Sequence, residues 1–497
     1  MKFIMGKNAF ENDLELTRRF GKEKVGGGNF ESYLSGEEEY FKILDHMIAV
    51  MIPWKKNYHP NQIREHLIFN YRRFKSYLRK LEKQPALKKG TVFFLPISET
   101  NTMFFEPIIK KLITKTGVKV LRFDYSLNGI KKELIKRKLP YVNFEKYLDK
   151  TSLRGAREIR KRYRKAFEIA KIILKRNKEY EELKPVIKYY FGVRNRFYEI
   201  LEFIAGLKNF IRIEKPSMIV VPDETMDIVR ATSYICKKMK IPCISMQSGN
   251  MINESPESGE TFAIKKTVFG PFARKKTIER GMSSKKIVVT GSPLYDVIFK
   301  KKMSKKKIND KKKKLGLIGK TVVLFASTTN LDIAKKRLNI LFKIANKNPN
   351  LKVIVKQHPG EYQDKRYEKF YRALAKKYKI NIIVSKEDMW KMLSLSDIYI
   401  TDISTTILEA LILRKAIILT NFEKFYDYEP YPEKKGVIWH AYNFKDVDMA
   451  IKHILHRKPG EEEEAFRKKL IEDNLYKVDG KSTERVCKLI EKLKLKN

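Results

Sequence analysis

Cysteine, tryptophan and histidine are scarce in this chain of 497 residues, with three, three and seven copies. The cysteines, Cys236, Cys243 and Cys487, show no metal-ligand spacing, and an odd number cannot all pair. We therefore expect no metal site and no disulfide framework. Free thiols indicate a reducing compartment, so a cytoplasmic protein is expected.

Long apolar runs are also missing. None approaches the roughly 18–20 residues that span a bilayer, and the longest, at 47–54, has the length of a core or interfacial segment. The N-terminus lacks the continuous apolar region and the cleavage site of a signal peptide, so none is predicted. Hydrophobic residues still make up 43% of the chain, enough for two or three domains with their own cores.

Acidic residues are outnumbered, with 58 Asp and Glu against 106 Lys and Arg and a formal net charge of +48. Such a surface attracts nucleic acid, an anionic membrane face or phosphorylated substrates. A lysine-rich proteome would explain the same excess without any partner. The sequence has no zinc-finger spacing, RNP-type aromatic motif or GXXG clamp, so nucleic acid is the least favoured of these partners.

Apolar runs of strand length alternate with helical stretches of about a dozen residues, which predicts βαβ units and parallel sheets. The alternation begins at 91–97, resumes at 217–223 after a long basic stretch, and restarts at 320–328 after ten lysines in fifteen positions. The predicted fold class is α/β, with two Rossmann-like domains facing a cleft. The predicted parts are a helical N-terminal extension (1–85), an N-terminal Rossmann-like acceptor domain (86–299) with a basic helical insertion (about 130–212), a Lys-rich linker (300–314), a C-terminal nucleotide-donor domain (315–475) and a closing helix (476–497).

The basic insertion has apolar residues at three- and four-residue spacing with Arg and Lys between them. Two interpretations stay open. The insertion forms either solvated helices packed on a sheet or a cationic face that rests on an anionic membrane.

The stretch VIVKQHPGEY, at 353–362, places a scarce histidine at the end of a predicted strand. Ligands of open parallel sheets bind beyond the carboxyl ends of the strands. Because Pro359 stops the strand directly after His358, we expect the imidazole to lie at this ligand-binding edge. The alternative is a histidine with a structural role only.

Other strand ends in the same predicted domain carry small polar groups. Ser404 is the predicted N-cap of the following helix, so its loop would present hydroxyls and free N–H groups to an anion. Glu409, one turn into that helix, could accept from a ribose diol or simply complement the helix dipole. Together with His358 and Pro359, the candidate nucleotide-binding residues here are Ser327, Thr328, Thr329, Ser404, Thr405, Thr406 and Glu409.

These groups suit a nucleotide diphosphate. The absence of a Walker loop and of GxGxxG argues against an NTPase or a dinucleotide enzyme. No cofactor is expected to be tightly bound.

The motifs KQHPGEY and LSDIYITDISTTILEALILRKAIIL resemble the donor domain of glycosyltransferases with the GT-B architecture. The nearest relatives by resemblance are CDP-glycerol glycerophosphotransferases, polysialyltransferases and capsule polysaccharide enzymes. The tail at 476–493 resembles the Asp-Gly-Lys-Ser segment of the glycerophosphotransferases. The segment at 268–298 is similar to a strand-helix-strand unit that these transferases share with UDP-N-acetylglucosamine 2-epimerases. The resemblance covers roughly 217–493.

This resemblance implies a metal-independent, inverting transferase. It would move a sugar or polyol phosphate from a CDP-, CMP- or UDP-linked donor to a polysaccharide or lipid-linked acceptor of the cell surface. His358 would contact the donor phosphates, Glu409 would bind the ribose, and Lys481 and Ser482 would add donors from the last helix. The basic helices would then rest on the inner membrane face.

The general base is the point of departure from the family pattern. Many relatives have Gln-His-Gly where this chain reads MQSGN, with Ser248 in place of the histidine. A serine cannot take a proton unaided at neutral pH, so either the base lies elsewhere or the chemistry differs, and a carboxylate is a plausible base. The candidates are Asp223 and Glu224 at a strand end, then Glu257 and Glu260, each of which could equally be an exposed loop acid. Asp296, after the GSP turn at 291–293, is interpreted as an ordinary first-turn acid.

The transferase is therefore the leading prediction. A UDP-sugar 2-epimerase of the same architecture is the alternative, disfavoured by the helical insertion and by the HPGE, STT and DGKS series. A basic nucleic-acid-binding protein is the alternative from another class, and it leaves the placement of His358 unexplained.

Overall fold

The computed structural model describes most of the chain from residue 90 onward and short pieces before it. The described residues are 15–20, 22, 24–25, 28–29, 90–123, 130–191, 196–249, 261–300, 303–328, 330–362, 364–402, 404–422, 430–457 and 459–494. Most of the predicted N-terminal extension lies outside them, as do Glu257, Glu260 and Thr329. The described residues of that extension form one short helical piece and an antiparallel pair of strands, β1 (Lys24–Val25) and β2 (Gly28–Asn29).

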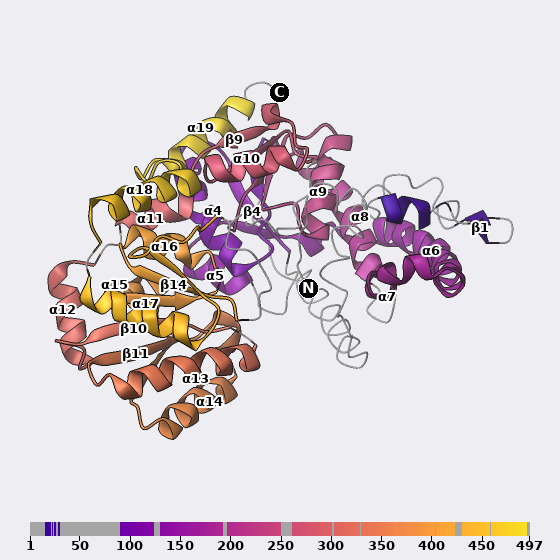
Figure 1. The fold of residues 1–497 in the computed structure, drawn as a ribbon. Helices are drawn as coiled ribbons and strands as arrows, with labels where there is room; N and C mark the ends of the chain where they lie inside the picture. The colour runs from indigo at the N-terminus through magenta and orange to yellow at the C-terminus, as the bar shows by residue number, and fades with distance from the viewer. Residues whose placement is uncertain are drawn as a thin grey trace. The chain divides into compact units, whose positions relative to one another are not determined.

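The chain folds into two compact units. Among the described residues, the N-terminal unit holds those up to 248, then 261–296 and 479–494, and the C-terminal unit holds 297–478. Each contains one parallel sheet flanked by helices (Figure 1). The predicted fold class, α/β with two Rossmann-like domains, is confirmed. The domain boundaries predicted at 85, 299, 314 and 475 stay predictions.

The N-terminal unit has a seven-stranded sheet in the order β5-β4-β3-β6-β7-β8-β9, with every neighbouring pair parallel. Its central strand, β6, reads MIVV and is buried along its whole length, as expected for a strand covered on both faces. The strands are β3 (Val92–Phe94), β4 (Val118–Arg122), β5 (Tyr141–Asn143), β6 (Met218–Val221), β7 (Cys243–Met246), β8 (Lys265–Val268) and β9 (Ile287–Val289).

Long helices pack on this sheet, and the last one comes from the far end of the chain. The helices are α4 (Glu99–Leu112), α5 (Ile130–Lys136), α6 (Lys150–Arg176), α7 (Lys184–Phe191), α8 (Arg196–Glu214), α9 (Asp227–Lys238), α10 (Pro271–Glu279), α11 (Pro293–Lys300), whose last residues belong to the C-terminal unit, and α19 (Ser482–Lys494). The predicted insertion is therefore not wholly helical, because β5 lies inside it and pairs with β4.

The C-terminal unit has a six-stranded parallel sheet in the order β12-β11-β10-β13-β14-β15. The strands β10 (Thr321–Ala326), β11 (Leu351–Lys356), β12 (Ile382–Ser385), β13 (Ile398–Thr401) and β14 (Ala416–Thr420) match predicted runs, while β15 (Ile438–Ala441) was not predicted. The helices are α12 (Lys305–Lys314), α13 (Leu331–Lys347), α14 (Lys365–Lys377), α15 (Met389–Leu395), α16 (Thr406–Ile412), α17 (Phe444–His456) and α18 (Glu461–Leu475).

The strand pairing in this unit sets where its polar loops lie. Side chains such as Val323, Val353 and Ile400 face a core shared with α13, α14 and α17. Because β10 lies between β11 and β13, the residues that follow these three strands meet at one edge of the sheet. That edge carries Ser327, His358 and Asp402.

Two further observations concern predictions made from the sequence. The Lys-rich segment forms α12, whose N-cap Ser304 accepts a hydrogen bond from the Lys307 N–H group at 3.3 Å. Its side chains are largely exposed, as expected for a solvated segment. In the parts of the chain that the structure describes, no helix combines the length and the apolar character needed to cross a membrane.

Candidate functional site

The loop after β11 holds His358 in a defined orientation. Its backbone N–H donates to Ser327 Oγ at 3.1 Å, and the Gly360 N–H donates to its Nδ1 at 3.1 Å. The ring retains exposed surface. Partial burial, and then the nearby Lys356, lower the pKa of His358, while Asp402 acts in the opposite direction. The structure thus presents a histidine that tends to be neutral at the predicted edge of the sheet.

The hydroxyl of Ser327 already has partners within the protein. It donates to Glu361 Oε1 at 2.5 Å while it accepts from His358. Its predicted role as a ligand donor stays a prediction, as does that of its neighbour Thr328. Sequence reasoning missed Glu361, which is fully buried and also accepts from Tyr371 Oη at 3.0 Å.

The Ser404-Thr405-Thr406 loop differs by one residue from the prediction. Thr405, in the right-handed helical region, is the N-cap of α16, and the prediction of Ser404 as N-cap is wrong. The first turn is tight, because the Ile407 N–H donates to the Ser404 carbonyl three residues back. Ser404 Oγ instead accepts from the Thr406 N–H at 3.3 Å.

Glu409 lies in the first turn of α16 and is buried. Burial raises its pKa to about 8, so the carboxyl group is protonated at neutral pH. Its Oε2 has no hydrogen-bond partner among the described residues. A buried polar atom in that state is costly unless a ligand supplies the partner.

Two further polar side chains near the ends of these strands were not predicted. Arg337 of α13 is buried and pairs with Asp402 Oδ2 at 2.9 Å, which fixes the acid that follows β13. Gln357 is buried directly before His358, and neither atom of its amide has a hydrogen-bond partner within the described chain. Arg337 could have been found, because it lies on the apolar face of a predicted helix. No sequence signal marked Gln357.

The predicted acids of the N-terminal unit follow β6. Asp223 Oδ2 accepts from the Ser248 backbone N–H at 2.7 Å and from its hydroxyl at 3.1 Å. Asp223 Oδ1 lies 3.4 Å from Nζ of the buried Lys266. Ser248 therefore supports Asp223. Glu224 is also buried, and its Oε1 lacks a hydrogen-bond partner among the residues described.

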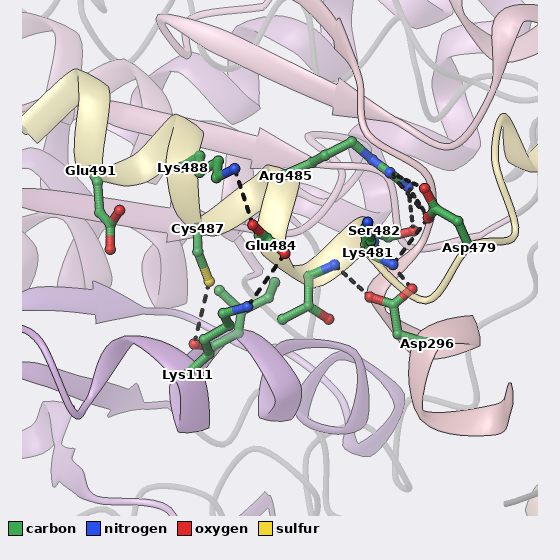
Figure 2. A network of polar contacts seen from close by, with 12 residues as sticks. Lys111, Asp296, Asp479, Lys481, Ser482, Glu484, Arg485, Cys487, Lys488 and Glu491 are labelled. Atoms are coloured by element: carbon green, nitrogen blue, oxygen red, sulfur yellow. Dashed lines mark hydrogen bonds and ion pairs between the residues drawn. The ribbon is translucent and has the colours of Figure 1, made fainter. Parts of the chain in front are cut away.

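The DGKS segment belongs to a polar network inside the N-terminal unit (Figure 2). The N–H groups of Ser482 and Thr483, at the start of α19, donate to the two carboxylate oxygens of Asp296 at 3.1 and 2.6 Å. Asp296 lies in the first turn of α11, as interpreted from the sequence, and it also caps a second helix, α19. The phosphate-binding roles of Lys481 and Ser482 stay predictions.

Arg485 joins this network to the GSP turn. Its Nε donates to the Thr290 carbonyl at 2.7 Å, and its Nη2 donates to Ser482 Oγ at 3.1 Å. It also pairs with Asp479 at 2.9 Å (Figure 2). Two motifs singled out in the sequence, GSP and DGKS, thus pack against each other.

No described part of the chain gathers three or more His, Cys, Asp or Glu side chains in a way that could hold a metal ion.

Comparison with protein-family models identifies the family. The model described as UDP-N-acetylglucosamine 2-epimerase matches residues 195–491, more than half of the chain. The chain belongs to the UDP-N-acetylglucosamine 2-epimerase family. A search of curated proteins found no match.

Solved structures show the same fold at low identity. The UDP-GlcNAc 2-epimerase from Neisseria meningitidis bound to UDP-GlcNAc is 14% identical, with a TM-score of 0.53 over 82% of this chain and 100% of that one. The enzyme from Methanocaldococcus jannaschii in complex with UDP-GlcNAc and UDP is 15% identical, with a TM-score of 0.52 over 81% and 99%. A glycosyltransferase from Rickettsia africae is 14% identical, with a TM-score of 0.52 over 82% and 100%. These likenesses support the predicted GT-B fold.

The family assignment corrects the leading functional prediction. The transferase prediction is wrong, because the family model that matches is that of the 2-epimerases. The resemblance to GT-B enzymes is supported, but the narrower one to glycerophosphotransferases and polysialyltransferases is not. The phosphate-binding roles predicted for the HPGE and STT motifs stay predictions. No comparison tests the predicted acceptor, membrane surface or nucleic acid.

Proposed function

We propose that the chain is a UDP-sugar 2-epimerase that inverts C2 of UDP-N-acetylglucosamine or a closely related UDP-sugar. The family match supports this reaction. Inversion at C2 proceeds when one group removes the C2 proton while the C1–O bond to UDP breaks, and a proton returns to C2 on the opposite face of the ring as the UDP oxygen bonds to C1 again. The observation that carries the proposal is Glu224, a buried acid after the central strand β6 whose Oε1 has no partner among the described residues.

The two acids after β6, Asp223 and Glu224, would have different roles. Asp223 already accepts from Ser248, and its other carboxylate oxygen lies near the buried Lys266. Glu224 has an uncommitted oxygen and is therefore the proposed proton-transfer group. Asp223 would orient the substrate or fix its neighbour.

The C-terminal unit would bind the nucleotide. His358 would donate to the phosphates, and the loop before α16 would add hydroxyls. Glu409 is protonated at neutral pH, and its unpartnered Oε2 would be satisfied by a ribose hydroxyl. The donor base is proposed to be uracil, because the matched family acts on a UDP-sugar. Of the CDP-, CMP- and UDP-linked substrates predicted from the sequence, the proposal therefore keeps the UDP-linked one.

The test is proton exchange at C2. UDP-N-acetylglucosamine incubated with the protein in D₂O is expected to give the C2 epimer and to incorporate deuterium at C2, read by proton NMR. Glu224→Gln should slow exchange by about a hundredfold or more, the range of general acid–base catalysis, while UDP still binds. Ser396→Ala, a buried serine whose hydroxyl donates to the Leu393 carbonyl, is the control. A wild-type protein that neither exchanges nor converts the substrate contradicts the proposal.

Binding is tested separately by calorimetry with UDP and CDP. His358→Ala is expected to weaken UDP binding tenfold or more, about 1.4 kcal/mol. CDP is expected to bind more weakly than UDP. Equal affinity of the alanine variant and the wild type would show that His358 has a structural role only.

A further inference from the structure

We propose that Ser327 and Glu361 are positioning residues that hold His358 in the tautomer with its proton on Nε2, so that the ring meets the nucleotide phosphates as a neutral hydrogen-bond donor. This inference rests on the proposed nucleotide site and adds the chemical form in which its histidine acts.

Glu361 is the buried residue to which Ser327 and the His358 loop are hydrogen-bonded. It has no exposed surface, although it lies in the polar loop HPGEY. Its carboxylate accepts from Ser327 Oγ at 2.5 Å and from Tyr371 Oη at 3.0 Å. Burial raises the pKa of Glu361, and these hydrogen bonds lower it again. Burying an acid costs more free energy of folding than burying an apolar side chain of similar size. A role in fixing the geometry of this loop would account for Glu361 at this position.

The hydroxyl of Ser327 connects Glu361 to the backbone of His358. A hydroxyl has one proton to donate, and Ser327 donates it to Glu361. Its lone pair is then directed to the His358 backbone N–H, which donates to it at 3.1 Å. The Glu361 N–H donates in turn to the His358 carbonyl at 2.9 Å. Both backbone groups of His358 are therefore tied, directly or through one hydroxyl, to Glu361.

With the backbone fixed, the ring nitrogens become distinct. The Gly360 N–H donates to His358 Nδ1 at 3.1 Å, and only an unprotonated nitrogen can accept. The proton of the neutral ring must then be on Nε2. A second proton would turn Nδ1 into a donor that faces another donor. The charged groups nearby are Lys356, which also disfavours the imidazolium, and Asp402, which favours it.

Lys356 is itself held in place. Its Nζ donates to the Gln357 carbonyl at 2.7 Å and to Tyr362 Oη at 2.6 Å. It is buried, and a buried lysine next to the histidine opposes a further positive charge. The positive charge opposite a phosphate would come from other groups, and the imidazole would supply a directional Nε2–H bond.

The first test reads the tautomer in the free protein. Selective ¹⁵N-histidine labelling of the full chain gives seven histidines to resolve, and His358→Ala identifies the signals of interest. At pH 7.5 we expect an unprotonated Nδ1 and a protonated Nε2. A proton on Nδ1, or a doubly protonated ring, overturns the inference. This reading does not depend on nucleotide binding, so it stands even if the protein proves not to bind UDP and the proposed function fails.

The second test separates positioning from stability. Ser327→Ala should weaken UDP binding by about tenfold and mix the His358 tautomers. Glu361→Gln keeps an oxygen that accepts from Ser327, so it should retain most of the affinity, whereas Glu361→Leu should not. Ser396→Ala and Tyr378→Phe are matched controls, since each removes a hydroxyl that donates within the same unit, to Leu393 and to Asn339.

Ser396→Ala and Tyr378→Phe should lower the unfolding midpoint about as much as Ser327→Ala does, and they should leave UDP affinity unchanged. If Ser327→Ala binds UDP as tightly as the wild type while His358→Ala does not, the positioning role is wrong. Should Glu361→Leu fail to fold, Ser327→Ala and Glu361→Gln still decide the question.

Discussion

Glu409 shows how burial sets the charge of a single side chain. Burial, and then repulsion from Asp388, raise its pKa to about 8, against about 4.3 for an exposed glutamate in an unfolded chain. Between these two values the folded protein holds a proton that the unfolded chain has lost. Stability is therefore greatest at the acidic end of this window and falls as the pH rises toward 8.

The prediction is a pH slope that depends on one residue. From about pH 5 to pH 8, the free energy of unfolding should fall by up to about 1.4 kcal/mol per pH unit through Glu409. Glu409→Gln, which stays neutral, should remove that part of the slope in urea titrations at each pH. Glu464→Gln, a partly exposed acid paired with Arg414, should keep it. An unchanged slope in Glu409→Gln would contradict the assignment.

Single residues also mark the limit of sequence-based prediction at the site. His358 could be found because it follows an apolar strand and precedes a proline. Glu361, three residues on, could not, because an acid in HPGEY looks like a solvated loop residue. Its burial is set by Tyr371 from α14 and Ser327 from the end of β10, which only the folded chain brings together.

At the scale of elements, sequence analysis missed the short pair β1 and β2 and, in the two parallel sheets, the edge strands β5 and β15. Strands β5 and β15 have three and four residues, too few to establish a period. The central strands were predicted well, because strands covered on both faces give continuous apolar runs. The start of α16 was misplaced by one residue, since a tight first turn leaves no mark in the sequence.

The contact between the GSP turn and α19 gives a prediction for a glycine. Gly291 has a φ of +75°, and a Cβ there would overlap Ser482 Oγ, which is held by Arg485. Gly316 has a φ of +65° and no atom within 4 Å of such a Cβ. Gly316→Ala should cost only the left-handed backbone strain, about 1–2 kcal/mol.

Gly291→Ala should cost about 1 kcal/mol more, because it adds the overlap with α19. Urea unfolding of both variants provides the comparison. If the two alanine variants are equally stable, the turn can move away from α19 and the packing of the two motifs is looser than the structure shows.

At the scale of the whole molecule, the last helix completes the first unit. Val486, Cys487 and Ile490 of α19 are buried, and the helix contacts α4. The surface pair Lys115–Glu491, at 2.9 Å, adds little, since exposed ion pairs contribute at most about 1 kcal/mol. The apolar contact with α4 and the hydrogen bonds through Asp296 and Arg485 therefore link α19 to this unit.

Deleting residues 479–497 should destabilise the N-terminal unit selectively. Hydrogen exchange resolved by peptide is the measurement. Protection should fall in β3, β6 and β7 and persist in β10, β11 and β13. Lys488→Ala, which removes only an exposed pair with Glu484, should leave both patterns unchanged. Equal loss in both sheets would mean that the two units unfold together.

The alternation of strands and helices was sufficient to predict both units, because it follows from backbone geometry and burial. The reaction could not be derived in the same way. The phosphate-binding edge predicted at His358 would serve transfer and epimerisation alike, and the sequence around the acids after β6 does not indicate which of the two reactions they would assist.

The position of α19 has a consequence for biosynthesis. A ribosome finishes the whole β10–β15 sheet before it reaches Ser482, whereas the unit that contains the β3–β9 sheet is complete only once α19 has been made. The part made first is thus the part completed last. Until α19 has emerged, the nascent chain leaves uncovered the side of α4 that α19 will cover, so the synthesis of α19 sets the earliest moment at which the first unit can close.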